Sequence, residues 1–423
     1  MAMIRAVKGC KDILPGETGK WRYVEEKARD IFASFGVFEI RTPLLERTEL
    51  FQRGIGAATD IVEKEMYTFL DRGDEYLTLR PEATASVIRA YVEHSLYAAD
   101  PVAKLFTIGP MFRRERPQKG RFRQFHQINV EFLGLDGPQA DGEIILLLTH
   151  LLKSLGLTDL GLEINSLGCL VCRPAFREAI QKFLAGREAG LCEDCRRRLH
   201  TNPLRVLDCK VAGCRELMTG APELGGFLCA SCETHQAKVL DILANFGLAY
   251  QINPRMVRGL DYYTRTAFEV TTESLGAQNA IAGGGRYDGL VAELGGPKIA
   301  GIGFAIGMER LLALLPQDDE SFKQRPHLFI VALGVEAFDT AFALGNRLRM
   351  QGLTVEMDYT GKSLKSQMKR ADKFGCRYAL ILGEKEMNDR TAELRDMANS
   401  TQSTLAFDNM EETLLTLQRA PTL

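Results

Sequence analysis

Residues 104–134 have the sequence KLFTIGPMFRRERPQKGRFRQFHQINVEFLG, and the organisation of the chain is best understood outward from them. Two largely apolar segments, 104–115 and 125–134, flank a polar and basic connection at 116–124. Strand-like segments joined in this way are typical of a β-hairpin. We therefore predict two long antiparallel strands, joined by an extended loop, within an antiparallel sheet.

Each strand of this hairpin is expected to have one partly polar face, because side chains alternate between the two sides of a strand. On one side of the second strand lie Phe125, Gln127, Asn129 and Glu131. A solvated sheet face is the ordinary explanation of such a pattern. The first strand places polar side chains on one of its own faces as well. We therefore expect a cleft shared by Arg113, Glu115, Gln127 and Glu131.

The loop of the hairpin, residues 116–123 (RPQKGRFR), is strongly basic. Seven Lys or Arg residues lie between positions 104 and 131. A guanidinium group matches phosphate oxygens as a bidentate donor, and the interleaved Phe122 and Phe125 could stack on a base. A mobile charged tip is the structural alternative, whereas the pattern as a whole indicates a nucleotide or nucleic-acid ligand.

Residues 80–85 (RPEATA) follow a strand predicted at 76–80, and Pro81 is expected to begin a helix. Glu82 would then lie in the first helical turn, where the helix dipole favours an acidic side chain. The functional alternative is a carboxylate that binds the ammonium group of a ligand, assisted by Thr84.

Residues 257–266 (VRGLDYYTRT) combine an arginine beside a glycine with an aspartate and two tyrosines. Burial of Arg258 without partners would be costly. A structural network would supply such partners. An anionic ligand would also supply them, with the tyrosines forming the walls of a pocket for a small planar group.

Two glycine-rich stretches, 282–289 (AGGGRYDG) and 301–311 (GIGFAIGMERL), would let the backbone approach a ligand closely. Neither matches the dinucleotide-binding or P-loop fingerprint, and neither contains Gly-Lys-Ser/Thr, which argues against a Walker-type ATPase. Arg310 would lie in the first turn of a helix at 307–315, where the dipole disfavours a cation. A bound phosphate would compensate for that position.

The composition describes an ordinary soluble globular protein, with 45% hydrophobic and 26% charged residues among 423. The formal net charge of −2 excludes a wholly basic nucleic-acid coat but not a local basic face. The longest aliphatic run, Ile144–Leu148, is far too short to span a membrane. Residues 1–15 lack the apolar core of a secretory signal. We expect a cytoplasmic protein without a membrane partner.

The chain is expected to form two domains. A polar, acidic linker at 316–326 separates them, and strands alternate with helices after it, which predicts a small, mostly parallel α/β domain. We place the first domain at 1–325, with a cysteine-rich insertion at about 167–235, and the second at 326–423.

Eight of the 10 cysteines lie in that insertion. They form four pairs with metal-ligand spacing, three of them C-x2-C: Cys169/Cys172, Cys192/Cys195, Cys209/Cys214 and Cys229/Cys232. Eight thiols could form two tetrahedral Zn²⁺ sites, and all-thiolate sites are closed and structural. Free thiols without metal are the alternative.

Several stretches together resemble the sequence motifs of one enzyme family. Residues 39–46 (EIRTPLLE), with Pro43 at the centre, are similar to motif 1 of the class II aminoacyl-tRNA synthetases. Residues 112–127 are similar to motif 2, and 301–310 to motif 3. Residues 258–263 and 283–288 resemble the signatures of histidyl-tRNA synthetases of the bacterial type. The likeness extends from Lys8 nearly to the C-terminus and is weakest in the cysteine-rich segment.

The resemblance implies an α+β catalytic domain built on an antiparallel sheet and a C-terminal α/β anticodon-binding domain. It implies activation of L-histidine with ATP to histidyl-adenylate, release of pyrophosphate, and transfer of histidine to the 3′ end of tRNA(His). A homodimer formed through motif 1 and the use of Mg²⁺ with ATP are also implied. Members of the family generally have an inserted domain that does not depend on metal.

For ATP, the resemblance assigns the α-phosphate to Arg113, the β- and γ-phosphates to Arg121 and Arg310, the adenine amino group to Glu115, and ring stacking to Phe125. Arg258 would bridge the α-phosphate and the carboxylate of histidine. Arg258, Arg113 and Gln127 are the expected catalytic residues, since two anions must be brought together for in-line attack.

For histidine, the resemblance assigns the ammonium group to Glu82, Thr84 and Gln127. The imidazole would meet Glu131 and Tyr263, with Tyr262 and Tyr287 lining the pocket, because a carboxylate and a phenol suit a ring with two polar nitrogens. Ala83 departs from the family, in which Gly is more usual, and its methyl group would tighten the pocket slightly.

Contacts with tRNA are expected from the cysteine-rich segment, at the acceptor stem, and from the second domain, at the anticodon. The basic residues Lys362, Lys365, Lys369 and Arg370 are candidates for the latter, with a solvated helix face as the alternative. A non-catalytic regulatory paralogue that binds histidine is the chief competing function. Such paralogues usually lose ATP-binding arginines and the C-terminal domain, and this chain retains both. Residues 258–263 argue against a synthetase for another amino acid, such as threonine or proline.

Overall fold

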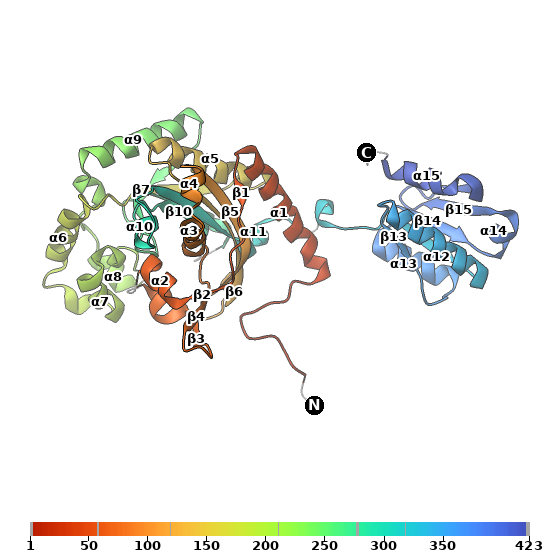
Figure 1. Cartoon of the computed structure of the whole chain (residues 1–423), viewed down its shortest axis with the longest axis horizontal. Helices are drawn as coiled ribbons and strands as arrows, with labels where there is room; N and C mark the ends of the chain where they lie inside the picture. The colour runs from red at the N-terminus through yellow and green to blue at the C-terminus, as the bar shows by residue number, and fades with distance from the viewer. Residues whose placement is uncertain are drawn as a thin grey trace. The chain divides into compact units, whose positions relative to one another are not determined.

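The computed structural model describes residues 3–56, 59–118, 120–209, 211–275, 279–317 and 319–419. Lys119 of the predicted basic loop lies outside these residues. The chain divides into two compact units, Met1–Ser321 and Phe322–Leu423 (Figure 1). No helix in the described ranges has both the length and the apolar character needed to cross a membrane.

The first unit is built on an eight-stranded sheet in the order β1-β5-β6-β11-β10-β9-β7-β8. Its strands are β1 (Phe38–Glu39), β5 (Ala103–Phe112), β6 (Gln124–Leu133), β7 (Gly161–Ser166), β8 (Gln251–Ile252), β9 (Thr264–Thr271), β10 (Ala280–Arg286) and β11 (Gly301–Gly307). Only the two short edge strands, β1 and β8, pair in parallel with their neighbours; every other pairing is antiparallel. The prediction of an antiparallel sheet is therefore confirmed.

The predicted hairpin is the pair β5 and β6. Met111 pairs with Phe125 and Thr107 with Asn129, so these residues share one face of the sheet with Gln127 and Glu131. The first strand ends at Phe112 rather than at the predicted residue 115. Beyond Phe112 the backbone N–H of Arg113 still donates in register to the Arg123 carbonyl, whereas the N–H of Arg114 donates to the Glu65 carbonyl. The two strands therefore separate at Arg114.

Helices cover the sheet, among them α5 (Pro138–Ser154). Pro138 stands at its start, and most of its apolar side chains, including Ile144, Leu148 and Leu151, are fully buried. Gly156 lies in the left-handed region just after it, as a helix-terminating residue does. The helix packs against α1 (Pro15–Ser34) and α9 (Ala230–Asn245).

A small three-stranded sheet, which the sequence did not predict, comprises β2 (Leu45–Arg47), β4 (Tyr76–Leu79) and β3 (Tyr67–Leu70), in that order. Helix α2 (Thr48–Ile55) and the π-helical turn η1 (Ile61–Glu65) connect its strands. Helix α3 begins at Thr84, not at Pro81 as predicted, and ends at Glu93. Glu82 therefore precedes the helix, and its carboxylate accepts the backbone N–H groups of Thr84 and Ala85 at 2.8 and 2.9 Å.

The remaining short helices of this unit are α4 (Leu96–Ala99), α10 (Leu290–Glu293), α11 (Met308–Leu314) and the turns η5 (Glu273–Leu275) and η6 (Glu320–Phe322). The described elements of the cysteine-rich segment are all helices or helical turns: α6 (Arg173–Leu184), η2 (Glu188–Gly190), α7 (Glu193–Thr201), η3 (Pro203–Val206), α8 (Ala212–Leu217) and η4 (Leu224–Phe227). Phe176, Ile180 and Leu199 are among the apolar residues that form its core.

The second unit has a five-stranded sheet in the order β13-β12-β14-β15-β16. Its elements are β12 (Leu328–Ala332), α12 (Val335–Met350), β13 (Val355–Met357), α13 (Leu364–Phe374), β14 (Tyr378–Leu382), α14 (Glu384–Asp389), β15 (Thr391–Asp396), β16 (Gln402–Ala406) and α15 (Phe407–Arg419). The predicted α/β class is confirmed, and β12 pairs in parallel with β13 and β14, but β15 and β16 are added antiparallel, so the sheet is mixed rather than mostly parallel. Helix α14 is too short for a parallel crossover, which needs about a dozen residues.

Candidate active site

A cavity of about 220 Å³ lies between the hairpin loop and the part of the sheet formed by β6, β11, β10 and β9. It is lined by Arg113, Glu115, Gly120, Arg121, Phe122, Phe125, Gln127, Arg258, Glu269, Ala280, Ile281, Ala282, Gly283, Ala305, Gly307, Glu309 and Arg310. All the residues predicted to bind ATP are among them, together with Arg258 and Gln127. The structure thus brings together side chains from four separate parts of the sequence.

Three arginines at this cavity are held by different partners. The Arg113 guanidinium lies 5.2 Å from the centre of the Phe125 ring, and its Nε donates to the Pro81 carbonyl at 2.9 Å. Arg121 Nε lies 3.1 Å from the Glu115 carboxylate. Arg310 donates to the carbonyls of Gly120 and Ala280 at 3.1 and 2.8 Å. Burial and the neighbouring Arg121 lower the pKa of Arg310, because its charge has too little compensation here.

Arg258 forms an ion pair with Glu269 of β9, with 3.1 Å between Nη1 and Oε1. Its guanidinium lies directly over Gly283, where a Cβ atom would overlap it, so the glycine triplet of β10 makes room for this arginine. Among the described residues, Arg258 Nε and Gln127 Oε1 are buried polar atoms without a hydrogen-bond partner. A buried unpaired donor and a buried unpaired acceptor on one cavity wall are the arrangement expected of a site that binds a polar ligand.

Six of the residues predicted to bind the substrate histidine do not line this cavity. They form a buried cluster instead: Glu82, Thr84, Glu131, Tyr262, Tyr263 and Tyr287. Thr84 donates to one Glu131 oxygen at 2.7 Å, and the Tyr287 hydroxyl donates to the other. The ring centres of Tyr262 and Tyr263 are 4.7 Å apart. Burial raises the pKa of Glu131 to about 8 and also raises the pKa of Glu82.

Comparison with known proteins places this arrangement in a family. A family model described as Histidyl-tRNA synthetase matches residues 9–311, and one described as Anticodon binding domain matches residues 327–417. The chain belongs to the histidyl-tRNA synthetase family. The predictions of family, class II fold and enzyme class are therefore confirmed.

Individual relatives agree with this assignment. The chain is 56% identical over 406 residues to a histidine--tRNA ligase of Geobacter metallireducens, covering 96% of this chain and 98% of that one. It is 54% identical over 417 residues to the ligase of Desulfosudis oleivorans, covering 98% of each. The crystal structure of apo histidyl-tRNA synthetase from S. aureus superposes with a TM-score of 0.83 at 36% identity, covering 97% of this chain and all of the other.

Two carboxylates of this synthetase at the cavity were missed from the sequence. Glu269 pairs with Arg258, and Glu309 of α11 accepts the backbone N–H of His126 at 2.9 Å and lies 3.1 Å from its Nδ1. Glu269 lies in β9, where the polar residue of an alternating pattern was a usable signal. Glu309 gave no such signal, because its partner lies on a distant strand.

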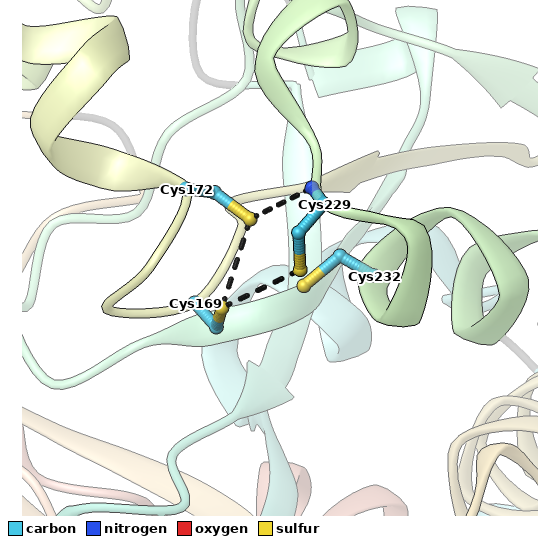
Figure 2. A group of neighbouring side chains, drawn as sticks. All are labelled: Cys169, Cys172, Cys229 and Cys232. Atoms are coloured by element: carbon cyan, nitrogen blue, oxygen red, sulfur yellow. Dashed lines mark hydrogen bonds between the residues drawn. The ribbon is translucent and has the colours of Figure 1, made fainter.

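The cysteines of the synthetase meet in two groups of four, and each group could hold a metal ion. Cys169, Cys172, Cys229 and Cys232 form one group (Figure 2). Cys192, Cys195, Cys209 and Cys214 form the other. The predicted pairs therefore combine first with fourth and second with third, an outcome that spacing along the chain could not decide.

Proposed function

We propose that this synthetase activates L-histidine with ATP in the cavity lined by Arg113, Gln127 and Arg258, and then transfers histidine to the 3′ end of tRNA(His). The observation that supports the site most directly is the pair of unpartnered buried atoms. Arg258 Nε can donate to a carboxylate, and Gln127 Oε1 can accept from an ammonium group. Together they match the two charges of a free amino acid.

The side chain of histidine is proposed to enter the cluster around Glu131. Glu131 and Tyr263 would bind the two ring nitrogens, while Tyr262 and Tyr287 enclose the ring. Glu82 and Thr84 would assist with the ammonium group. An amino acid that lacks ring nitrogens would leave buried polar groups unpaired, which discriminates strongly against it.

ATP is proposed to lie over the hairpin loop. Phe125 would stack on adenine, Glu115 would accept from its amino group, and Arg121 and Arg310 would bind the β- and γ-phosphates. Arg113 and Arg258 would hold the α-phosphate and the attacking carboxylate in line, because two anions react only when their charges are neutralised and fixed. Mg²⁺ prefers carboxylate oxygens, and Glu269 on the cavity wall fits it. When bound, it would neutralise the departing pyrophosphate.

Amino-acid-dependent ATP–pyrophosphate exchange across all twenty amino acids tests this proposal. We expect exchange with histidine alone, and a loss of about 10²–10³-fold in Arg258→Ala. Exchange with a different amino acid would contradict the histidine assignment. Binding of histidine without exchange would instead favour the regulatory paralogue.

The synthetase is further proposed to be a homodimer formed through residues 39–46. Strand β1 lies at the edge of the large sheet. Large apolar side chains are exposed on it and on the neighbouring small sheet, including Phe38 at 73%, Phe69 at 46% and Leu45 at 40%. Exposed large apolar side chains beside an unpaired sheet edge suit an interface between two chains. Sedimentation should give twice the chain mass, and Phe38→Asp should shift the equilibrium toward monomer.

The second unit is proposed to bind the anticodon, with residues 1–325 as the catalytic domain and 326–423 as the anticodon-binding domain. Lys362, Lys365 and Lys369 are exposed beside or on α13, whereas Arg370 pairs with Asp358 at 3.3 Å. The tripeptide Gly361-Lys362-Ser363 matches the end of a Walker motif, but the first glycine of that motif is missing from the sequence before it. Charge reversal of the three lysines should raise KM for tRNA without changing pyrophosphate exchange.

The insertion at about 167–235 is proposed to bind structural Zn²⁺ and to contact the acceptor stem of tRNA. Each group of four cysteines supplies the thiolate ligands that Zn²⁺ takes in structural sites. Arg196 is exposed on α7, so Arg196→Glu should raise KM for tRNA and leave histidine activation unchanged. The cytoplasm, where tRNA is charged, is the proposed compartment.

A further inference from the structure

We propose that the cysteine-rich segment contains two separate metal sites with nested ligands, and that the inner one positions the loop containing Arg258. The outer site comprises Cys169, Cys172, Cys229 and Cys232, and the inner site comprises Cys192, Cys195, Cys209 and Cys214. The ions are of the Zn²⁺ class, because the donors are thiolates alone.

The spacing of the sulfur atoms supports tetrahedral thiolate sites. Within each group all four ligand atoms lie within 4.8 Å of one another. Zn–S bonds of about 2.3 Å separate the sulfurs of a tetrahedron by about 3.8 Å. The Sγ atom of Cys169 lies 3.6 Å from that of Cys172 and 3.9 Å from that of Cys229. Cys192 Sγ is 3.8 Å from Cys209 Sγ.

A backbone N–H group also points at a sulfur in each group. Cys229 N donates to Cys172 Sγ at 3.1 Å in the outer site, as Figure 2 shows. Cys192 N donates to Cys214 Sγ at 3.2 Å in the inner site. Such donors stabilise negative charge on sulfur, which a metal-bound thiolate carries. The same kind of contact recurs in two groups that share no residue.

The two sites constrain different parts of the segment. The outer ligands lie where the chain leaves β7 and where it enters α9, so an ion there ties the ends of the segment together. The inner pairs enclose α7 and η3 in the sequence. An ion at the inner site therefore fixes residues 193–206, one of the parts of the segment that contact the catalytic body.

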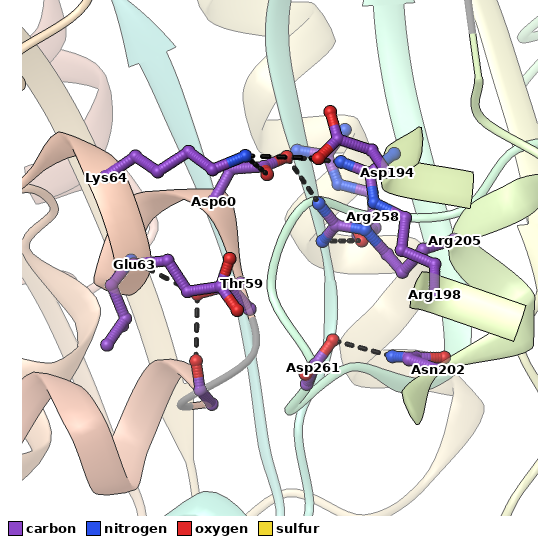
Figure 3. A network of polar contacts seen from close by, with 12 residues as sticks. Thr59, Asp60, Glu63, Lys64, Asp194, Arg198, Asn202, Arg205, Arg258 and Asp261 are labelled. Carbon is purple, nitrogen blue, oxygen red and sulfur yellow. Dashed lines mark hydrogen bonds and ion pairs between the residues drawn. The ribbon is translucent and has the colours of Figure 1, made fainter. Parts of the chain in front are cut away.

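The contacts between residues 193–206 and the catalytic body form a polar clamp, shown in Figure 3. Arg198 forms an ion pair with Asp60 at 2.5 Å, and Lys64 forms one with Asp194 at 3.1 Å. Asn202 donates to Asp261 at 2.8 Å, and Arg205 donates to the carbonyl of Arg258 at 3.4 Å.

The clamp thus reaches the proposed active site through the backbone. Arg173 of α6 also donates to the carbonyl of Tyr263, so side chains of the insertion hold the loop 258–263 near both of its ends. On this basis, which rests on the proposed function of Arg258, Asn202 and Arg205 are positioning residues for histidine activation. Displacing a reacting group by about 1 Å can cost as much as 10²-fold in rate.

Metal analysis of the full chain, purified without chelator, tests the sites independently of activity. We expect two Zn²⁺ per chain, one in Cys229→Ser, one in Cys209→Ser and two in the control Cys10→Ser. Substitution with Co²⁺ should give the thiolate charge-transfer bands of tetrahedral sites. Wild-type protein that holds no metal while all eight thiols titrate would overturn the proposal, and a single ion per chain would overturn the two-site assignment. The number of Zn²⁺ ions bound per wild-type chain tests the two-site assignment even if a variant fails to fold.

Histidine-dependent exchange kinetics test the clamp. Arg205→Ala should lower kcat/KM for histidine by about tenfold or more, with ATP binding unchanged, and Arg205→Lys should restore part of it. Arg187→Ala, at an exposed position of the same insertion, is the matched control and should behave as wild type. Equal kinetics in Arg205→Ala and wild type would overturn the positioning role. Loss of metal in Cys209→Ser with unchanged histidine kinetics would overturn the proposal that the inner ion positions the loop containing Arg258.

Discussion

Arg258 and Glu269 form an ion pair at 3.1 Å on the wall of the cavity, and this pair leaves Nε of Arg258 without a partner. The glutamate therefore orients the guanidinium and compensates its charge while the site holds no histidine. A bound carboxylate would compete with Glu269 for the same charge, since both anions lie against one cation.

Glu269→Gln keeps a hydrogen-bond acceptor beside Arg258 but removes the negative charge. We expect the free protein to unfold at lower temperature, because a buried cation has lost its counter-charge. Histidine should bind several-fold more tightly, since its carboxylate then supplies the missing charge. Calorimetric titration without ATP measures the affinity. Weaker binding than wild type would contradict the argument, and Glu273→Gln, on the exposed turn η5, is the control.

Asp141 and Arg286 form a fully buried ion pair between α5 and β10, and His235 lies 2.8 Å from the same aspartate. Asp141→Ala would leave Arg286 buried without its partner, which costs about 3–5 kcal/mol. Asp241→Ala removes an exposed pair with Lys238 and should cost far less stability, because water and salt screen such a pair. Thermal unfolding of the two variants compares the costs directly. Equal shifts in Tm would show that the buried pair contributes no more than the exposed one.

Glu131 makes stability depend on pH, because burial raises its pKa from 4.5 to about 8. The folded protein binds this proton more tightly than the unfolded chain does. Its contribution to stability is therefore complete below pH 4.5 and is lost as the pH rises through about 8. Wild type should lose stability relative to Glu131→Gln over that range, by at most ~1.4 kcal/mol per pH unit. Parallel changes in Tm for both proteins across this range would refute the assignment.

Gly303 of β11 lies beside the Glu131 carboxylate, and a Cβ atom there would overlap both that group and the Val130 carbonyl. Gly303→Ala should cost about 1–3 kcal/mol through overpacking and raise KM for histidine more than KM for ATP. Gly16 in the first turn of α1 has nothing within 4 Å of an added Cβ, so Gly16→Ala is the control. An unchanged KM for histidine would place the proposed imidazole pocket elsewhere.

Local patterns in the sequence were sufficient for the elements and for much of the cavity. Alternation along 104–115 and 125–134 predicted the hairpin and the shared face of its two strands, because period-two patterns depend only on neighbouring residues. The same pattern identified Arg113, Glu115 and Gln127, which do line the cavity. The three glycines at 283–285 were different. Their strand depends on tight pairing with β9 and β11, so a segment with little intrinsic strand preference could not be assigned locally.

Long-range pairing was beyond the sequence alone. Spacing showed four cysteine pairs, but only folding showed that Cys169 and Cys172 meet Cys229 and Cys232. The partners of Arg258 and Arg286, namely Glu269 and Asp141, lie on other elements, and Arg205 contacts Arg258 from the insertion. Periodicity and turn chemistry are properties of adjacent residues, whereas ion pairs and metal sites depend on which elements the sheet order brings together.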